Sequence, residues 1–417
     1  MSAGLRAGYK QTEVGVIPED WEVGNIGTLC TAVLDCHHST PVWTTSGELV
    51  IRNQNIRDGK LDLSEPSFTD AKHFAERTRR AVPTYGDLVI TREAPMGLVC
   101  MIPEGQKCCL GQRMVLLRLN RDVVETQYLL YAILSEAVQR SISVAGGTGS
   151  TVSNLRIPVL KDLMIAKPNL LEQRAIAAAL SDVDGLLGGL DRLIVKKRDL
   201  KQAAMQQLLT GQTRLPGFSG EWKVKRLGET GVFLKGSGVK KDESQSGPHP
   251  CIRYGEIYTR HNDYIKEFYS FISVEVAATA RLLKQGDLLF AGSGETKEEI
   301  GKCVAFVDSF KAYAGGDIVI LRPQSVNSLF LGFSLNTPRI NRQKASRGQG
   351  DAVVHIGSTA LADITLNLPP LPEQTVIATV LSDMDTELAA LQARRSKTQG
   401  LKQAMMQELL TGRIRLV

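Results

Sequence analysis

Residues 171–215, LEQRAIAAALSDVDGLLGGLDRLIVKKRDLKQAAMQQLLTGQTRL, align without a gap on residues 372–416, PEQTVIATVLSDMDTELAALQARRSKTQGLKQAMMQELLTGRIRL. In this alignment 23 of the 45 residues are identical. The same offset of 201 residues pairs Trp21 with Trp222 and Arg52 with Arg253. Because similarity at one fixed period is the signature of an internal repeat, we interpret the sequence as a tandem duplication.

The repeated segment has the apolar spacing of a long helix. Its apolar residues recur at alternating steps of four and three, which is the seam pattern of a coiled coil. Gly211 and Gly412 follow the repeated Leu-Leu-Thr and are expected to end the helices. About 37 residues at ~1.5 Å each give a rod about 55 Å long. The expected seam consists of Ile176, Leu180, Val183, Leu187, Leu190 and Ile194 in the first copy, and of Ile377, Leu381, Met384, Leu388 and Leu391 in the second.

The presence of two such helices in one chain favours their pairing with each other. We expect an antiparallel coiled coil in which the first seam faces the second, so that the helices act as a ruler between the segments that they separate. The alternative is that the helices form a hairpin packed within one core.

The segments before the helices are much less alike, because residues 30–165 and 231–366 share only scattered anchors. Short strands are expected at 86–91, 114–119, 287–290 and 317–321, and 126–139 has the pattern of an amphipathic helix. We therefore expect two α/β (α+β) domains in tandem, separated by two long helices that form an antiparallel coiled coil, with a pseudo-two-fold internal repeat. The expected division is an N-terminal arm (1–20), module 1 (21–168), spacer helix 1 (169–215), module 2 (216–369) and spacer helix 2 (370–417).

Length and composition suggest a cytoplasmic protein of several domains. The 417 residues suit two or three domains, and no apolar run reaches the ~18–20 residues that span a bilayer. The first 21 residues lack an apolar signal core. Seven cysteines without a Cys-x-x-Cys pair indicate reduced thiols. The net charge of +6 permits a polyanionic partner but does not establish one.

The motifs, taken in order, resemble the DNA-specificity subunits of type I restriction–modification systems. Each helix opens with a Pro-x-x-Leu-x-Glu-Gln-like sequence, at 168–173 and 369–374, and closes with LKQAMMQELLTG or a close copy. YKQTEVGVIPEDW at 9–21 and LPGFSGEW at 215–222 are also similar to that family. The resemblance extends over essentially the whole chain. It is specific because several weak motifs recur in the same order, twice, at one spacing.

This resemblance implies a non-catalytic subunit that recognises a double-stranded DNA sequence in a phage-defence system. Modules 1 and 2 would be target-recognition domains, each reading one half of a split, asymmetric target, and the helices would set the gap and dock the modification subunits. The implied partners are two modification subunits with S-adenosylmethionine and two restriction subunits with ATP and Mg. That complex would be an adenine DNA methyltransferase and an ATP-dependent endonuclease. No cofactor, no metal and no membrane partner is expected on this chain.

The motif content agrees with that division of labour. The Asn-Pro-Pro-Tyr or Asp-Pro-Pro-Tyr string of adenine methyltransferases is absent, since Pro369-Pro370 is followed by Leu371. Neither Gly-x-Gly-x-x-Gly nor a P-loop occurs, since Gly301-Lys302 is followed by Cys303. Two other classes stay open: a nuclease or methyltransferase fused to its own reader, and an adaptor that joins proteins through the coiled coil without reading DNA.

Two patterns resemble metal sites. Asp287 followed by Glu295-Thr296-Lys297 has the acidic pattern of metal-dependent nucleases, but the repeat counterpart around Asp87 lacks it, so a charged loop is expected. A second cluster fits no common zinc spacing, and buried thiols with a surface histidine pair are expected there: Cys30, Cys36, His37 and His38.

Polar and basic residues around the expected strands are the candidates for DNA contact. Arg can bind guanine, and Asn or Gln can bind adenine, in the major groove, whereas clustered cations suit phosphates. A solvated surface charge is the alternative for each single residue. Residues 146–153, GGTGSTVS, would either follow a DNA backbone or form a plain linker. The candidates are Arg52, Asn53, Gln54, Arg57, Arg77, Arg79, Arg80 and Arg92 in module 1, and Lys240, Lys241, Arg253, Tyr254, Arg260, Arg339, Arg342, Lys344 and Arg347 in module 2.

Overall fold

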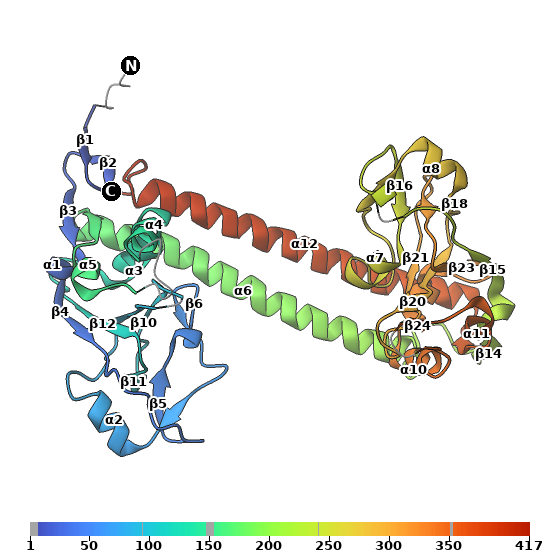
Figure 1. Cartoon of the computed structure of the whole chain (residues 1–417), viewed down its shortest axis with the longest axis horizontal. Helices are drawn as coiled ribbons and strands as arrows, with labels where there is room; N and C mark the ends of the chain where they lie inside the picture. The colour runs from blue at the N-terminus through green and yellow to red at the C-terminus, as the bar shows by residue number, and fades with distance from the viewer. Residues whose placement is uncertain (1–6, 94, 147–153, 241, 351–352) are drawn as a thin grey trace. The chain divides into compact units, whose positions relative to one another are not determined.

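The structure is a computed structural model that describes residues 7–93, 95–146, 154–240, 242–350 and 353–417. The chain forms two compact units, residues 1–191 with 393–417, and residues 192–392. Each unit therefore combines one module, the first part of the helix that follows it and the last part of the other long helix (Figure 1). Among the described residues, no helix has the length and apolarity needed to cross a membrane.

Module 1 is built on two main sheets. An antiparallel sheet has the strand order β10-β9-β12-β4, and a second has the order β11-β5-β8 with β11 parallel to β5. The first and last strands of the module, β3 and β13, pair antiparallel. The strands are β1 (Tyr9–Thr12), β2 (Gly15–Pro18), β3 (Glu22–Asn25), β4 (Cys30–Asp35), β5 (Glu48–Ile51), β6 (Ile56–Arg57), β7 (Lys60–Leu61), β8 (Phe68–Thr69), β9 (Leu88–Thr91), β10 (Val99–Met101), β11 (Cys108–Leu110), β12 (Met114–Leu119) and β13 (Met164–Lys167). The helices are α1 (Ile26–Leu29), the 3-10 turn η1 (Asn53–Asn55), α2 (Ala71–Arg77), α3 (Thr126–Leu134), α4 (Glu136–Ala145), α5 (Ile157–Lys161) and α6 (Leu170–Leu208).

Module 2 repeats this plan with different residues. Its antiparallel sheet has the order β15-β23-β19-β21, and its second sheet the order β17-β16-β22-β18 with β16 parallel to β22. The strands are β14 (Lys223–Arg226), β15 (Gly231–Lys235), β16 (His249–Ile252), β17 (Ser270–Ile272), β18 (Arg281–Leu282), β19 (Leu288–Ala291), β20 (Ser293–Gly294), β21 (Cys303–Ala305), β22 (Tyr313–Ala314), β23 (Ile318–Pro323), β24 (Val354–His355) and β25 (Thr365–Leu368). The helices are η2 (Leu227–Thr230), η3 (Asp242–Ser244), α7 (Tyr254–Thr259), α8 (Val274–Thr279), α9 (Ser328–Ser334), α10 (Pro338–Ala345), α11 (Ser358–Ala362) and α12 (Leu371–Leu409).

The central strands read as continuous apolar runs because both faces of the sheet are buried. In β9, Leu88 and Ile90 belong to one core cluster and Val89 to another. Alternate side chains of a strand point to opposite faces, so both sets find apolar neighbours. Strand β19 divides in the same way, with Leu288 in one cluster and Leu289 in the other. The strands expected at 86–91, 114–119, 287–290 and 317–321 are thus present as β9, β12, β19 and β23.

The helix expected over 126–139 is broken in the structure. Helix α3 ends at Leu134, and the Oγ of Ser135 accepts a hydrogen bond from the backbone nitrogen of Val138, which starts α4. A serine hydroxyl in this position satisfies a free amide at a helix start, and serine is therefore a strong helix N-cap. The amphipathic pattern continues across the break, which is why the sequence suggested one helix.

The repeated Glu-Gln at the start of each long helix ties that helix to its module. Gln173 accepts a hydrogen bond from the backbone nitrogen of Glu125 at 2.8 Å and donates one to the carbonyl of Pro168 at 2.8 Å. Gln374 repeats both bonds, with Asn327 at 2.9 Å and Pro369 at 2.8 Å. Both glutamines are buried, so these bonds satisfy polar groups that water does not reach.

The long helices run antiparallel within each unit. The expectation that the first seam faces the second is wrong, because the first residues of each seam pack against the end of the other helix. Ile176 and Leu180 pack with Leu409 and Leu410, at the end of the other helix. In the second unit Ile377 and Leu381 likewise pack with Leu208 and Leu209. A heptad pattern marks the apolar face of a helix and leaves its register open, so the sequence could not supply the partner. The seam residues Ile176, Leu180, Leu187, Leu190, Ile194, Ile377, Leu381 and Leu388 are buried, and Val183, Met384 and Leu391 are half-buried.

Candidate DNA interface

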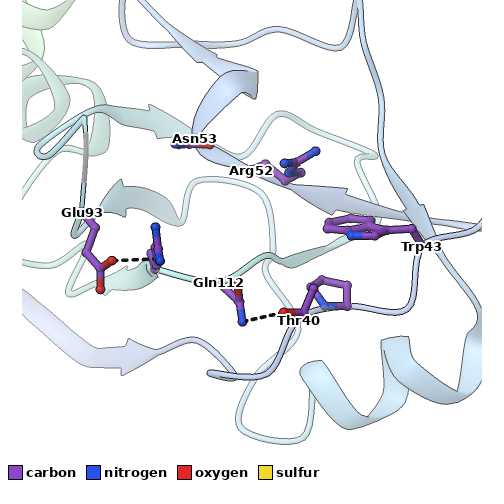
Figure 2. Close-up of a pocket in the computed structure, with 8 residues that line it drawn as sticks. Thr40, Trp43, Arg52, Asn53, Glu93 and Gln112 are labelled. Atoms are coloured by element: carbon purple, nitrogen blue, oxygen red, sulfur yellow. Dashed lines mark hydrogen bonds and ion pairs between the residues drawn. The ribbon is translucent and has the colours of Figure 1, made fainter. Parts of the chain in front are cut away.

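Module 1 carries a polar hollow of about 310 Å³ at the edge of its two sheets. Figure 2 shows Arg52 beside Trp43, and Gln112 pointing toward Thr40. The Arg52 guanidinium lies 4.9 Å from the centroid of the Trp43 ring, and the Trp43 side chain is 44% exposed. An exposed aromatic ring with a stacked cation offers both a flat surface and hydrogen-bond donors to a ligand. The hollow is lined by Thr40, Pro41, Trp43, Arg52, Asn53, Glu93, Gln112 and Arg113.

The position of Arg52 is set by hydrogen bonds to neighbouring side chains. Its backbone nitrogen donates to Oδ1 of Asn55 at 3.0 Å, and its Nη1 lies 3.5 Å from the hydroxyl of Ser67. In module 2 the backbone nitrogen of Arg253 donates to Oε2 of Glu256 at 3.1 Å, and its Nη1 donates to Ser244 at 3.0 Å. The two arginines predicted from the repeat therefore occupy the same local structure in both modules.

An ion pair forms the opposite side of the first hollow. Arg113 Nε lies 2.7 Å from Glu93 Oε2, and the Arg113 side chain is 63% exposed. Gln112 donates to the carbonyl of His38 at 2.7 Å and to the hydroxyl of Thr40 at 3.1 Å. The hollow thus presents donors and acceptors on a fixed frame, as a surface that reads base edges requires.

Module 2 has a hollow of about 460 Å³ on its own antiparallel sheet. Ser293 Oγ lies 2.9 Å from Nδ1 of His355. Lys235 and Asp317 add one charge of each sign, and both side chains are exposed. The hollow is lined by Phe233, Leu234, Lys235, Gly292, Ser293, Asp317, Ile318, Val319, His355, Ile356, Gly357 and Ser358.

Two predicted DNA contacts are wrong because their side chains are buried. The guanidinium of Arg77 donates to the carbonyls of Leu110, Ser39 and His37 at 2.9–3.1 Å, which fixes a loop to β11. Lys344 is 1% exposed, and its Nζ donates to the carbonyl of Gly301 at 2.8 Å. Burial lowers the pKa of Lys344 to about 8.

Three further residues of the predicted set make internal contacts. Arg92 Nη1 lies 2.9 Å from both carboxylate oxygens of Asp35, and its Nε donates to the carbonyl of Leu155. Arg347 donates to the carbonyls of Gln343 and Asp363. Arg57 is exposed and lies 3.2 Å from Asp62.

The remaining predicted residues stay candidates. Asn53 and Arg253 are half-buried, and Tyr254 is 40% exposed. The Arg260 guanidinium lies 5.1 Å from the ring centroid of Tyr269. Lys241 lies outside the described residues, as do residues 147–153 of the small-residue segment. The exposed members are Gln54, Arg79, Arg80, Lys240, Arg260, Arg339 and Arg342.

The two sequence patterns that resemble metal sites, at Asp287 and at Cys36-His37-His38, have other roles in the structure. Asp287 is fully buried, and its carboxylate accepts two hydrogen bonds from Arg322 at 2.7 and 2.8 Å, so it belongs to a core ion pair. Cys36 is buried, whereas His37 and His38 are exposed and bond to Ser39 and Asp35. Within the part of the chain that the structure describes, no three His, Cys, Asp or Glu side chains are grouped to hold a metal ion. All seven cysteines are free thiols.

Sequence reasoning missed Trp43, Glu93, Gln112 and Arg113, which line the first hollow. A signal for Arg113 was present. Residues 111–118, GQRMVLLR, align with 315–322, GGDIVILR, at an offset of 204 rather than 201. A small insertion within module 2 relative to module 1 hid this correspondence.

The comparisons with known proteins agree with this geometry. The model of the family "Type I restriction modification DNA specificity domain" matches residues 18–190 and again 219–398. The type I restriction enzyme MjaVIII specificity subunit of Methanocaldococcus jannaschii is 23% identical over 424 residues, which cover 96% of this chain and 94% of that protein.

Two solved structures have the same fold. The S subunit of a type I restriction–modification system from M. genitalium gives a TM-score of 0.59 at 16% identity, with 97% of each chain covered. A chain from a study of complex assembly and conformational transition of the type I R-M system gives a TM-score of 0.59 at 17% identity, with 95% of this chain and 99% of that chain covered. Since the family model covers most of the sequence in two successive matches, the chain belongs to the type I restriction–modification DNA specificity subunits, the non-catalytic subunits that recognise the DNA sequence.

Proposed function

We propose that module 1 reads one half of a split, asymmetric DNA target and that module 2 reads the other half. The observation that carries this proposal is the double match of one DNA-specificity model, each match covering a module and the first part of its helix. Two separate readers on one chain need separate surfaces, and each module has its own hollow with charged residues in its lining. The expected boundaries of the modules, 21–168 and 216–369, belong to this proposal.

The catalytic steps belong to partner subunits in this proposal. Two modification subunits supply S-adenosylmethionine for adenine methylation, and two restriction subunits supply ATP- and Mg-dependent translocation and cleavage. The complex works on DNA in the cytoplasm and defends the cell against phage. A family of specificity subunits fits this arrangement, because recognition and catalysis are then on different chains.

A module exchange tests the proposal. Residues 30–165 are replaced by the equivalent residues of a relative with a different target, and genome methylation is sequenced in cells that carry the complete system. One half of the methylated motif should change, while the other half and the gap stay the same. Exchange of residues 231–366 is the matched control and should change only the other half. A chimera that alters both halves contradicts the two-reader model.

A further inference from the structure

The two hollows share one corner of the duplicated fold, where Glu93 and Arg113 line the first hollow and their counterparts Ser293 and Asp317 line the second. In module 1 the backbone nitrogen of Arg92 donates to the carbonyl of Arg113 at 2.8 Å, and that of Leu155 donates to the carbonyl of Arg92 at 2.8 Å. In module 2 Gly292 donates to Asp317 at 2.7 Å, and Ile356 donates to Gly292 at 2.9 Å. The edge of each sheet is therefore closed by the same pair of backbone hydrogen bonds.

The other end of the same strands keeps its side chains as well as its backbone. Arg118 on β12 lies 2.7 Å from the buried carboxylate of Asp87. Arg322 on β23 lies 2.7 Å from the buried carboxylate of Asp287. A buried carboxylate without its cation would be strongly destabilising, which explains why both copies retain this pair.

At the hollows, in contrast, the side chains have changed on an unchanged backbone. Glu93 and Asn154 are joined by an antiparallel bridge in module 1, and Ser293 and His355 form the same bridge in module 2. The strand register also places Asp35 of module 1 where module 2 has Lys235, because both pair with equivalent residues of the central strand. The two modules therefore offer different hydrogen-bonding groups at the same places.

One position at each hollow is also conformationally costly. Arg113 has a φ of 67° and Asp317 a φ of 57°, both in the left-handed region. Glycine adopts this region without steric cost, whereas a side chain makes it unfavourable, more so for arginine than for aspartate. Both residues precede the central strand directly, and both side chains are exposed. Each module thus keeps a solvent-facing side chain where glycine would be easier to accommodate, and function is a reason to keep it.

We infer that Arg113 and Asp317 are specificity-determining residues, one in each module, and that each contacts a base edge of double-stranded DNA. This inference rests on the proposed function and names the side chains that perform it. The Arg113 guanidinium donates to O6 and N7 of a guanine, and the Asp317 carboxylate accepts from N4 of a cytosine. Glu93 holds Arg113 in place before DNA binds, and an ion pair this exposed is easily exchanged for a base.

The test of Arg113 uses the complete system with the full-length chain, and genome methylation is sequenced. Arg113→Gly should fold normally, because glycine suits this backbone. It should relax one guanine position in one half of the motif, with discrimination falling about tenfold to a hundredfold, and leave the other half unchanged. Arg113→Lys should relax the same position, since an ammonium keeps the charge but not the two-pronged geometry. Asp58→Gly is the matched control, because Asp58 also has a left-handed backbone (φ 48°) but lies in the β6–β7 turn. The methylated motif of this variant should be the same as that of the wild type.

The same design applies to module 2. Asp317→Gly should relax a cytosine position in the other half of the motif, and Ser325→Gly, at a left-handed residue (φ 58°) outside the hollow, should not. An unchanged motif in Arg113→Gly or Asp317→Gly would overturn the inference for that module. A uniform loss of methylation with the motif intact would also overturn it, because that is the signature of a phosphate contact. A wild-type chain that gives no split motif would instead refute the proposed function.

Discussion

Lys344 shows at the scale of one residue how burial overrides a charge pattern. It lies in a run of basic residues on α10, but its side chain is buried in module 2, where its Nζ donates a hydrogen bond to the Gly301 carbonyl. Burial, with a smaller contribution from the nearby Lys302, lowers the pKa of the Lys344 ammonium from 10.5 to about 8. The charged form is therefore less favourable in the folded chain than in the unfolded chain.

Replacement of Lys344 should make the chain more stable at neutral pH. Below pH 8 the amine is protonated in both states, so the full cost of burying the charge is present, and it declines as the pH rises from about 8 to 10.5. Lys344→Met should therefore raise the free energy of unfolding at pH 7 by about 1–2 kcal/mol, after allowing for the lost hydrogen bond. Denaturant unfolding at pH 7 and pH 9.5 measures this, and the advantage over wild type should shrink at pH 9.5. Arg342→Met, at an exposed residue of the same helix, is the control. An equal difference at both pH values would contradict the explanation.

Each long helix begins with a buried glutamate that is neutralised from the end of the other helix. Arg214 holds Glu373 through two bonds of 2.6 and 2.7 Å. Arg415 binds Glu172 in the other unit, and there the indole of Trp21 adds a third donor at 3.0 Å. These pairs connect the start of one helix with the residues that follow the other.

This difference predicts unequal costs for two equivalent substitutions. Arg214→Ala leaves the fully buried Glu373 without its cation and should cost about 3–5 kcal/mol of unfolding free energy. Arg415→Ala leaves Glu172 with the Trp21 donor, and a hydrogen bond to a charged group contributes about 1.5–3 kcal/mol. The same substitution removes the exposed ion pair with Asp20, worth up to about 1 kcal/mol, so its net cost should be about 1–2 kcal/mol smaller. Denaturant unfolding of the two variants side by side checks the order. Equal losses would show that the indole does not support the carboxylate.

At the scale of elements, the sequence predicted which segments form strands and helices better than it predicted where they end or which residues they pack against. Runs of apolar residues predicted β9, β12, β19 and β23. Apolar residues at alternating steps of four and three predicted the two long helices. The register of the helix pair was not predictable, because it depends on contacts with residues far along the chain. The break at Ser135 comes from a local serine N-cap, which the continuous amphipathic pattern concealed. Of the residues predicted to contact DNA, Arg52 lines the first hollow and Arg253 keeps the same hydrogen-bonding pattern in module 2, so both stay candidates, whereas Arg77 and Lys344 are buried. A cluster of basic residues says nothing about which side chains point inward.

At the scale of the whole molecule, each of the two long helices contributes residues to both compact units. The chain passes from one unit to the other between Asp191 and Arg192 on α6 and between Gln392 and Ala393 on α12. Contacts on each side of this boundary stay within one unit: Arg395 lies 2.7 Å from Asp191, and Lys201 lies 2.8 Å from Asp385. Insertions at both boundary points therefore lengthen the helices while every contact inside each unit is kept. An insertion in one helix alone, for example after Gln207, would pull Leu208 and Leu209 from the core.

Insertion of four residues at both points should lengthen the gap between the half-targets by one or two base pairs. Four helical residues add about 6 Å and a right-handed rotation of about 40°. One or two base pairs add about 3–7 Å and about 34–69° in the same sense, so distance and rotation agree. Insertion of seven residues is the matched control. It adds about 10.5 Å, the length of about three base pairs, but almost no net rotation, whereas three base pairs rotate the DNA by about 100°.

Genome methylation in cells that carry each variant should therefore show unchanged half-targets with a longer gap for the four-residue insertion, and little methylation at any gap for the seven-residue insertion. Methylation at the original gap in the four-residue variant would mean that the helices do not measure the distance. Their length would then serve only to dock the modification subunits, and both insertions would weaken assembly to a similar degree. The contrast between the two insertions separates these roles, because only a ruler responds to rotation as well as to length.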